Sequence, residues 1–273
     1  MIMEGQNKPL TSTSLLRRME RLLADRAQGN SRAAQELVYA AWETPDSNAA
    51  FDLLTRAVEL EVTNIDAWLG LLDYTPTTVE ERIPILRRLV ALGEQKLGKR
   101  VFEQNKGHFW GLLETRPYMR ARAQLAWNLM ELDRFEESIA EYEAMLDLNP
   151  NDNQGMRYPL MACYLAIKRL DGARRLLEQY DELGFSALWA WAYVLERLLA
   201  GDPDGATQAL QDARRQNRHA QAFFVEQRKV PRHLPGSYSP GSKEEAIIAW
   251  NILRRAWTRH PEAHAWLKAQ CRK

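Results

Sequence analysis

The sequence Ser138-Ile-Ala-Glu-Tyr142 decides the fold, because its pairing of a small and a large residue four places apart returns later in the chain. It returns as Ala173-Arg-Arg-Leu-Leu177 and as Ala206-Thr-Gln-Ala-Leu210, so the small residues are 35 and 33 positions apart. Residues four apart lie on one face of a helix, where the small side chain makes room for a neighbouring helix and the large one fills the gap. The pattern therefore predicts helices that pack against one another at a regular interval.

Two further pairs, Ala50 with Leu54 and Ala246 with Trp250, extend the pattern toward both ends of the chain. The interval resembles the period of about 34 residues in the tetratricopeptide repeat, which is a helix-turn-helix unit. This resemblance implies an all-α fold, a right-handed α-helical solenoid of tetratricopeptide-like repeats.

The remaining intervals predict the domain organisation. We expect a flexible N-terminus over residues 1–13 and one helical repeat domain over residues 14–273, with its first helix from Ser14 to Gln28. The longer intervals place insertions near residues 98–115 and 229–242, and the second of these is rich in proline and glycine. Insertions in a solenoid become loops, often on the binding face.

Composition excludes several classes of protein. The 273 residues carry a net charge of +1, with 45% hydrophobic and 27% charged residues, which is typical of a folded, water-soluble chain. Cys163 and Cys271 are too few for a disulfide framework, so we expect reduced thiols. The most apolar run, Ala187 to Leu195, is less than half of the roughly 20 residues that cross a bilayer. These features predict a cytoplasmic protein without a membrane span.

A narrower resemblance lies between about Gly107 and Leu267. Three blocks carry it: Phe109 to Ala121, Asn149 to Tyr158, and Lys229 onward to Trp250. They resemble tetratricopeptide proteins related to the suppression-of-tumorigenicity-seven family, and the chain looks like a soluble relative of bacterial type. The resemblance implies an interaction scaffold or adaptor and supplies no catalytic residue.

The resemblance to tetratricopeptide solenoids also implies where a partner binds, because the first helix of each unit lines their concave surface. Phasing from the small-large pairs predicts a groove with a basic end and an aromatic-aliphatic floor, suited to a protein or peptide with an acidic group and bulky apolar anchors. We expect a variant with both Arg120→Glu and Trp191→Ala to lose partner capture, while its thermal melting changes little. The predicted partner-binding residues are Arg116, Arg120, Gln124, Trp127, Tyr158, Trp191 and Leu195.

The alternative hypothesis is a helical-repeat binder of RNA or single-stranded nucleic acid. Residues 96–122 and 214–233 are rich in Lys and Arg. They are interleaved with aromatic residues that could stack on bases, namely Phe109, Trp110, Tyr118, Phe223 and Phe224. The pI near 7.8 is low for this role. Self-association remains open.

No pattern predicts catalysis or a cofactor. His260 and His264 have the spacing of metal ligands on a helix, but no third ligand is evident and the order is not His-Glu-x-x-His. No Ser or Cys lies in a nucleophile-elbow context, and no glycine-rich loop of the phosphate-binding kind is present. We therefore predict a non-catalytic protein without metal or cofactor.

Overall fold

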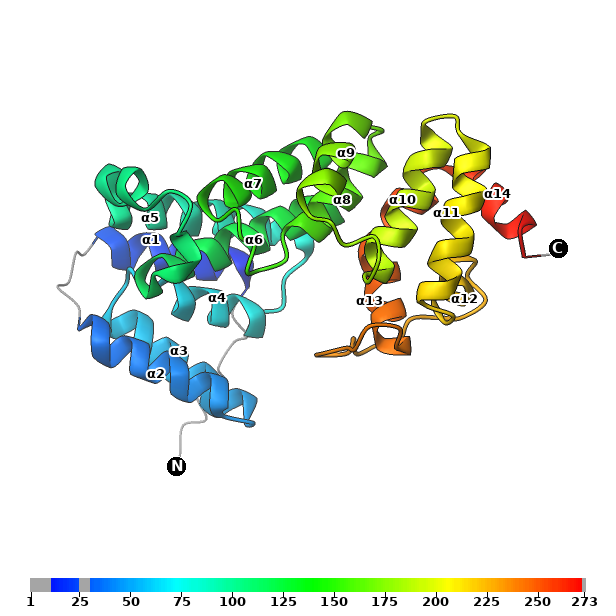
Figure 1. Ribbon diagram of the computed structural model, residues 1–273. Coiled ribbons are helices and arrows are strands. Elements are labelled where there is room, and N and C mark those ends of the chain that lie inside the picture. Colours follow the sequence, from blue (N-terminus) through cyan, green and yellow to red (C-terminus); the bar gives the residue numbers. More distant parts are fainter. Residues whose placement is uncertain (1–10, 25–29, 272–273) are drawn as a thin grey trace, which may run out of the picture. The chain divides into compact units, whose positions relative to one another are not determined.

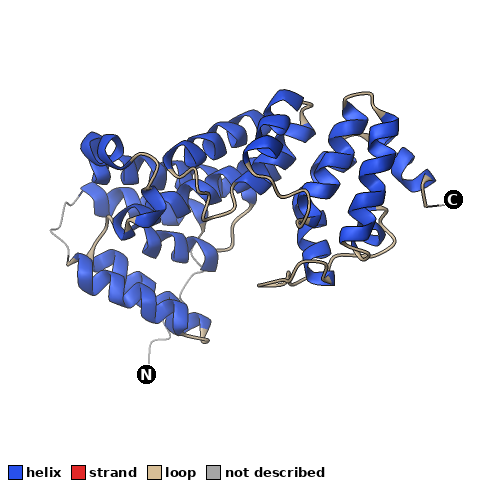
Figure 2. Ribbon diagram, in the orientation of Figure 1, coloured by secondary structure: helices blue, strands red, loops and turns tan. Residues whose placement is uncertain are grey.

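The computed structural model describes residues 11–24 and 30–271, and all regular structure among them is helical (Figures 1 and 2). The expected all-α fold of helix-turn-helix pairs is confirmed. The described residues form two compact units, which divide within helix α7 (Phe135–Leu148).

The first unit comprises the described residues up to 134, together with residues 144–153. Its helices pair in sequence order, with α2 against α3 and α5 against α6. They are α1 (Ser12–Ala24), α2 (Ser31–Glu43), α3 (Ser47–Leu60), α4 (Ile65–Tyr74), α5 (Val79–Asn105), the short 3₁₀ helices η1 (Phe109–Gly111) and η2 (Leu113–Thr115), α6 (Arg116–Glu131) and the end of α7.

The second unit comprises residues 135–143 and the described residues from 154 onward. It contains the start of α7 and then α8 (Arg157–Ala166), α9 (Leu170–Gln179), α10 (Ala187–Leu199), α11 (Pro203–Gln216), α12 (Ala220–Phe224), α13 (Lys243–Thr258) and α14 (Pro261–Ala269). Here α8 packs against α9 and α10 against α11.

The same turn joins the two helices of three successive pairs. Asp133, Lys168 and Gly201 have φ values of 57°, 58° and 77°. After each, a backbone N–H closes on a carbonyl five residues earlier: from Arg134 to Leu129, from Arg169 to Tyr164 and from Asp202 to Arg197, at 2.9, 2.8 and 2.9 Å. This left-handed closure satisfies carbonyls at the end of a helix. The turns therefore repeat at the same intervals as the small-large pairs.

The small-large pairs themselves lie in the core. Ser138 and Tyr142 are fully buried, as are Ala206 and Leu210. Leu177 is the exception, being only half-buried, while its neighbour Leu176 takes the buried position. The spacing thus identified the packed face of these helices to within one residue.

Helix starts follow from local chemistry. Asn30, Asp46 and Asn64 each cap a helix by accepting a hydrogen bond from the N–H three residues on. Thr78 and Glu81 form a reciprocal capping box at the start of α5. Such caps satisfy N–H groups that have no partner inside the helix.

Two expectations near the insertions and the N-terminus need correction. The first helix begins at Ser12 and not Ser14. Residues 25–28 of its expected span lie outside the described residues, as do residues 1–10 of the expected flexible end. The insertion near residue 98 is partly helical, since α5 kinks at Gly98 and continues to Asn105. Gly98 has a φ of 70°, which glycine adopts without the steric cost of a side chain.

Helix α13 lies on the first helices of two repeats. It packs against α8 and α10 as well as against its neighbours α12 and α14. Trp250 and Trp257 of α13 are buried there, and the Trp257 ring meets Trp191 of α10 edge-on at 6.4 Å between centroids. The chain therefore covers this surface of the second unit with its own segment.

Candidate partner-binding groove in the first unit

A groove of about 480 Å³ opens between the first helices of the repeats in the first unit. Its walls come from α2, the α3–α4 connection, the start of α4, the middle of α5 and the start of α6. The lining residues are Ser31, Arg32, Gln35, Tyr39, Glu61, Thr63, Asn64, Ile65, Asp66, Gly93, Lys96, Leu97, Val101, Leu113, Glu114, Pro117, Tyr118 and Arg120.

A paired charge joins α4 to α6 in this groove. Arg120 donates from Nε and Nη2 to the two carboxylate oxygens of Asp66, at 2.8 and 2.5 Å. Asp66 is 1% exposed, whereas the Arg120 side chain is 31% exposed. Asp66 also lies in the first turn of α4, where the helix dipole favours a negative charge. The guanidinium is therefore held in one orientation at the groove surface.

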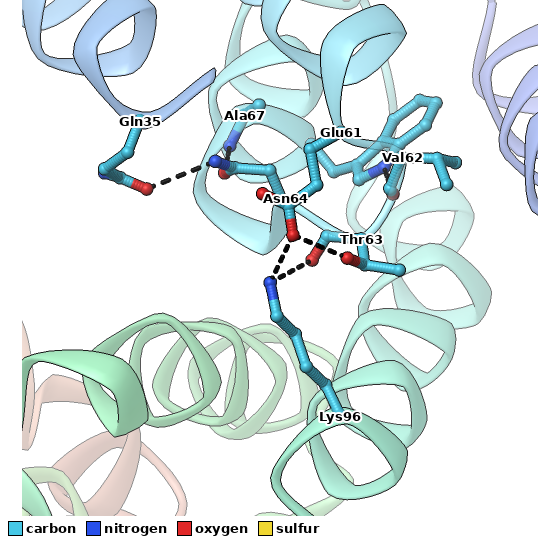
Figure 3. Close-up of polar contacts among 8 residues, drawn as sticks. Gln35, Glu61, Val62, Thr63, Asn64, Ala67 and Lys96 are labelled. Atoms are coloured by element: carbon cyan, nitrogen blue, oxygen red, sulfur yellow. Dashed lines mark hydrogen bonds and ion pairs between the residues drawn. The ribbon is translucent and has the colours of Figure 1, made fainter. Parts of the chain in front are cut away.

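A second polar cluster forms the floor where α3 leads into α4 (Figure 3). Lys96 of α5 donates to Glu61 at 2.6 Å, and Thr63 donates to the same carboxylate at 2.8 Å. Burial alone would raise the pKa of Glu61, but hydrogen bonds from Lys96, Ser31 and Thr63 outweigh it and lower the pKa below its ordinary value. Glu61 is thus ionised at neutral pH and holds Lys96 against the floor.

Asn64 ties this floor to α2. Its side-chain oxygen accepts from the Ala67 N–H as the cap of α4, and its amide group donates to Oε1 of Gln35 at 3.2 Å (Figure 3). One side chain thereby sets both the start of α4 and the position of Gln35. The polar floor is fully built from residues of the first unit.

Large apolar side chains stand exposed at the rim. Tyr39 and Trp42 lie one turn apart on α2, are 49% and 53% exposed, and have ring centroids 5.5 Å apart. The Arg120 guanidinium carbon lies 5.6 Å from the centre of the Trp42 ring. Leu113, on the α6 side, is 72% exposed. Exposed aromatic rings beside an ordered cation are typical of partner-binding surfaces.

Comparison with known proteins identifies the repeat in part of the chain. Residues 129–190 match the family model of the tetratricopeptide repeat. This stretch includes two of the three repeated turns described above, those at Asp133 and Lys168. The narrower resemblance to the suppression-of-tumorigenicity-seven family is not confirmed.

Solved and curated proteins add little to this match. One solved structure that is similar is YrrB, described as a tetratricopeptide repeat protein with an unusual peptide-binding site. It is 14% identical in sequence, the alignment covers 75% of this chain and 93% of that chain, and the TM-score is 0.45. No curated protein matches the chain.

The structure places the predicted residues of the first unit in different surroundings. Arg120 lines the groove, as described. Arg116 instead donates to the carbonyl of Trp110 at 3.0 Å and stacks over its ring. Gln124 and Trp127 lie further along α6, half-buried, and are not among the groove lining.

Tyr158 belongs to a separate cluster in the second unit. Its hydroxyl donates to Glu182 at 2.8 Å and accepts from Arg157 at 2.8 Å. Burial and the hydrogen bond to Glu182 raise the pKa of Tyr158, so the phenol stays neutral. The tyrosine is half-buried, and its polar atom is engaged within the protein.

Trp191 and Leu195 are fully buried in the second unit. The Trp191 ring stacks on Phe224 of α12 with centroids 4.3 Å apart, and Trp257 of α13 closes against it. A partner cannot reach these two side chains in this structure, because both are buried and α12 and α13 pack on Trp191. We therefore do not carry them into the binding proposal below.

The sequence analysis did not predict the groove residues Tyr39, Asp66 and Lys96, or Trp42 beside the groove. A signal for the aromatic pair was present, since a Tyr and a Trp three positions apart lie on one side of a helix. Asp66 and Lys96 had no such signal, because Asp66 is separated from its partner Arg120 by 54 residues and Lys96 from Glu61 by 35.

The rings invoked for nucleic-acid stacking are mostly unavailable. Phe109, Tyr118, Phe223 and Phe224 are buried. The basic residues between 96 and 122 are largely engaged as well, for example Lys106 with Asp147 at 2.7 Å and Arg122 with the Tyr118 hydroxyl at 2.6 Å. Nucleic-acid bases therefore cannot stack on these buried rings in this structure.

The two histidines with metal-like spacing serve the fold. His260 and His264 each place Nε2 at 2.8 Å from a backbone carbonyl, of Leu165 and Phe224 respectively. Over residues 11–24 and 30–271, no group of three or more His, Cys, Asp or Glu is arranged to hold a metal ion.

Both cysteines are free thiols. Within the described residues, none of the helices combines the length and apolarity that a membrane span requires.

Proposed function

We propose that this protein is a non-catalytic interaction scaffold that holds a segment of a protein partner in the groove of the first unit. The observation that carries the proposal is the pair of exposed rings, Tyr39 and Trp42, beside the Arg120 guanidinium that Asp66 holds in place. Aromatic and Arg side chains contribute most of the binding energy at protein interfaces. The match to the tetratricopeptide repeat supports the same reading, since stacked helical repeats present extended surfaces for binding.

The proposed contact set differs from the sequence-based set. It retains Arg120, adds Tyr39, Trp42 and Leu113, and omits the other six predicted residues, of which Trp191 and Leu195 are buried. The proposed setting is the cytoplasm, and neither nucleic acid nor membrane is part of the proposal. Self-association through the same rim is a further outcome that the experiment below can detect.

The test is capture of partners from native cells, read by mass spectrometry. The wild-type protein is compared with the double variant Tyr39→Ala, Trp42→Ala, and with Phe185→Ala as control. Phe185 is an equally exposed aromatic side chain, 57% exposed, but it lies in the second unit. We expect the double variant to lose the partner and the control to keep it. Equal recovery with all three proteins would exclude the groove as the binding surface.

A further inference from the structure

The groove carries no net charge to offer a partner. Its lining includes three basic residues, Arg32, Lys96 and Arg120, and three acidic ones, Glu61, Asp66 and Glu114. Two of the cations are held by buried carboxylates, Lys96 by Glu61 at 2.6 Å and Arg120 by Asp66 at 2.5 Å. Arg32 forms only an exposed pair, with Glu36 at 3.1 Å. An acidic partner would have to compete with Glu61 and Asp66 for Lys96 and Arg120. The lining also has equal numbers of acidic and basic residues, so its charge favours an uncharged segment.

The rim instead offers a preorganised aromatic surface. Tyr39 and Trp42 are inclined to each other by 55°, and α2 sets their spacing. The Trp42 ring also rests near the Arg120 guanidinium, which two hydrogen bonds to Asp66 immobilise. Rings held in this way lose little side-chain freedom when a ligand packs on them.

The floor supplies hydrogen-bond donors that suit backbone carbonyls. Gln35 accepts from Asn64 through its oxygen, so its NH₂ group is the end that can donate. Tyr39, whose hydroxyl is both donor and acceptor, lines the same groove.

From these observations we propose that the groove binds an uncharged, proline-rich segment in the polyproline II conformation; this inference rests on the proposed function. Such a segment has no internal hydrogen bonds, so its carbonyls are free to accept from the floor. Proline rings pack well in aromatic-lined grooves, and the preformed helix loses little entropy on binding. Leu113, which also lines the groove and is 72% exposed, provides the second apolar contact.

The experiment titrates dye-labelled synthetic peptides with the full chain and follows fluorescence anisotropy. The first peptide repeats Pro-Pro-Leu, the second has alanine in place of proline, and the third repeats Pro-Pro-Glu. We expect the first peptide to bind and the second to bind at least about tenfold more weakly. The third should bind no more tightly than the first. Affinity for the first peptide should change little with salt, because no ion pair forms on binding.

Variants place the binding in the groove. Trp42→Ala should weaken the first peptide by about tenfold, while the control Phe185→Ala should leave it unchanged, with circular dichroism checking that both proteins are folded. Equal binding of the alanine peptide, tighter binding of the acidic peptide, or indifference to Trp42→Ala would each overturn the inference. If no proline peptide binds but capture of the cellular partner still requires Tyr39 and Trp42, this inference fails and the proposed function stands.

Discussion

At the scale of single residues, the ion pair of Asp66 and Arg120 determines which substitutions in the groove destabilise the fold. A buried carboxylate that loses its cation keeps its desolvation cost, so removal of one partner destabilises more than removal of both. This overturns the expectation that Arg120→Glu with Trp191→Ala leaves melting unchanged. A glutamate at position 120 would face the buried Asp66, and loss of the buried Trp191 ring would by itself cost about 3–5 kcal/mol.

We predict that Arg120→Ala lowers the free energy of unfolding by about 2 kcal/mol, less than for a fully buried pair because Arg120 is partly exposed. Adding Asp66→Asn should recover part of this loss, since the uncompensated charge is then removed. The matched control is Arg32→Ala, whose exposed pair with Glu36 should contribute no more than about 0.5 kcal/mol. Urea unfolding measures all four proteins. An Arg120→Ala effect no larger than that of the control would show that the pair does not stabilise the fold.

At the scale of elements, one carboxylate joins the start of α10, the end of α11 and the long loop before α13. Glu245 is buried and accepts from the Ala187 N–H at 2.9 Å, the Asn217 amide at 2.9 Å and the Gly241 N–H at 2.7 Å. Three donors from separate segments therefore depend on a single side chain. The loop itself exposes basic residues on its first half, including Arg228, Lys229 and Arg232.

We predict that Glu245→Ala loosens this loop and destabilises the protein by about 2 kcal/mol, because buried donors are left without acceptors. Trypsin should then cleave after Arg228, Lys229 or Arg232 faster than in the wild type, which mass spectrometry of the fragments can follow. The control is Glu244→Ala, an exposed neighbour on the same helix turn. Equal cleavage rates for the two variants would mean that Glu245 does not anchor the loop.

At the scale of the whole molecule, stability is spread over two compact units, and one buried histidine makes the second unit sensitive to pH. Burial lowers the pKa of His260, although its hydrogen bond with the Leu165 carbonyl opposes the shift, and Lys168 and Arg259 lower the pKa further. The folded protein thus takes up this proton less readily than the unfolded chain. The contribution to stability is complete above the ordinary pKa of 6.5 and decreases as the pH falls below it.

We predict that the free energy of unfolding decreases between about pH 7.5 and about pH 5.5, before the carboxylates begin to protonate. His260→Gln removes the titrating group, so it should lower stability at neutral pH and flatten the dependence over this range. Urea unfolding at several pH values, followed by circular dichroism, measures both slopes. Parallel slopes for the two proteins would assign the pH dependence to other groups.

Helix positions in this protein follow from short-range pattern. Helix α7 (Phe135–Leu148) contains the pair Ser138 and Tyr142, and α13 (Lys243–Thr258) contains the pair Ala246 and Trp250, as the small-large spacing predicts. The continuation of α5 past Gly98 did not follow from pattern, because a glycine with positive φ can end a helix or only bend it. In this protein the helix only bends, and after the kink Phe109 packs against Phe102 and Tyr118.

The sequence by itself determined the helices, their pairing and the repeat, because all three depend on side chains a few positions apart. Only the tertiary structure decided which surface stays open. Trp191 and Leu195 have the apolar character of a binding floor, but both are buried and α12 and α13 pack on Trp191, whereas the groove beside Tyr39 and Trp42 remains open. The physical reason is that burying an apolar face is equally favourable whether the cover is a partner or a distant part of the same chain, and no local pattern distinguishes the two.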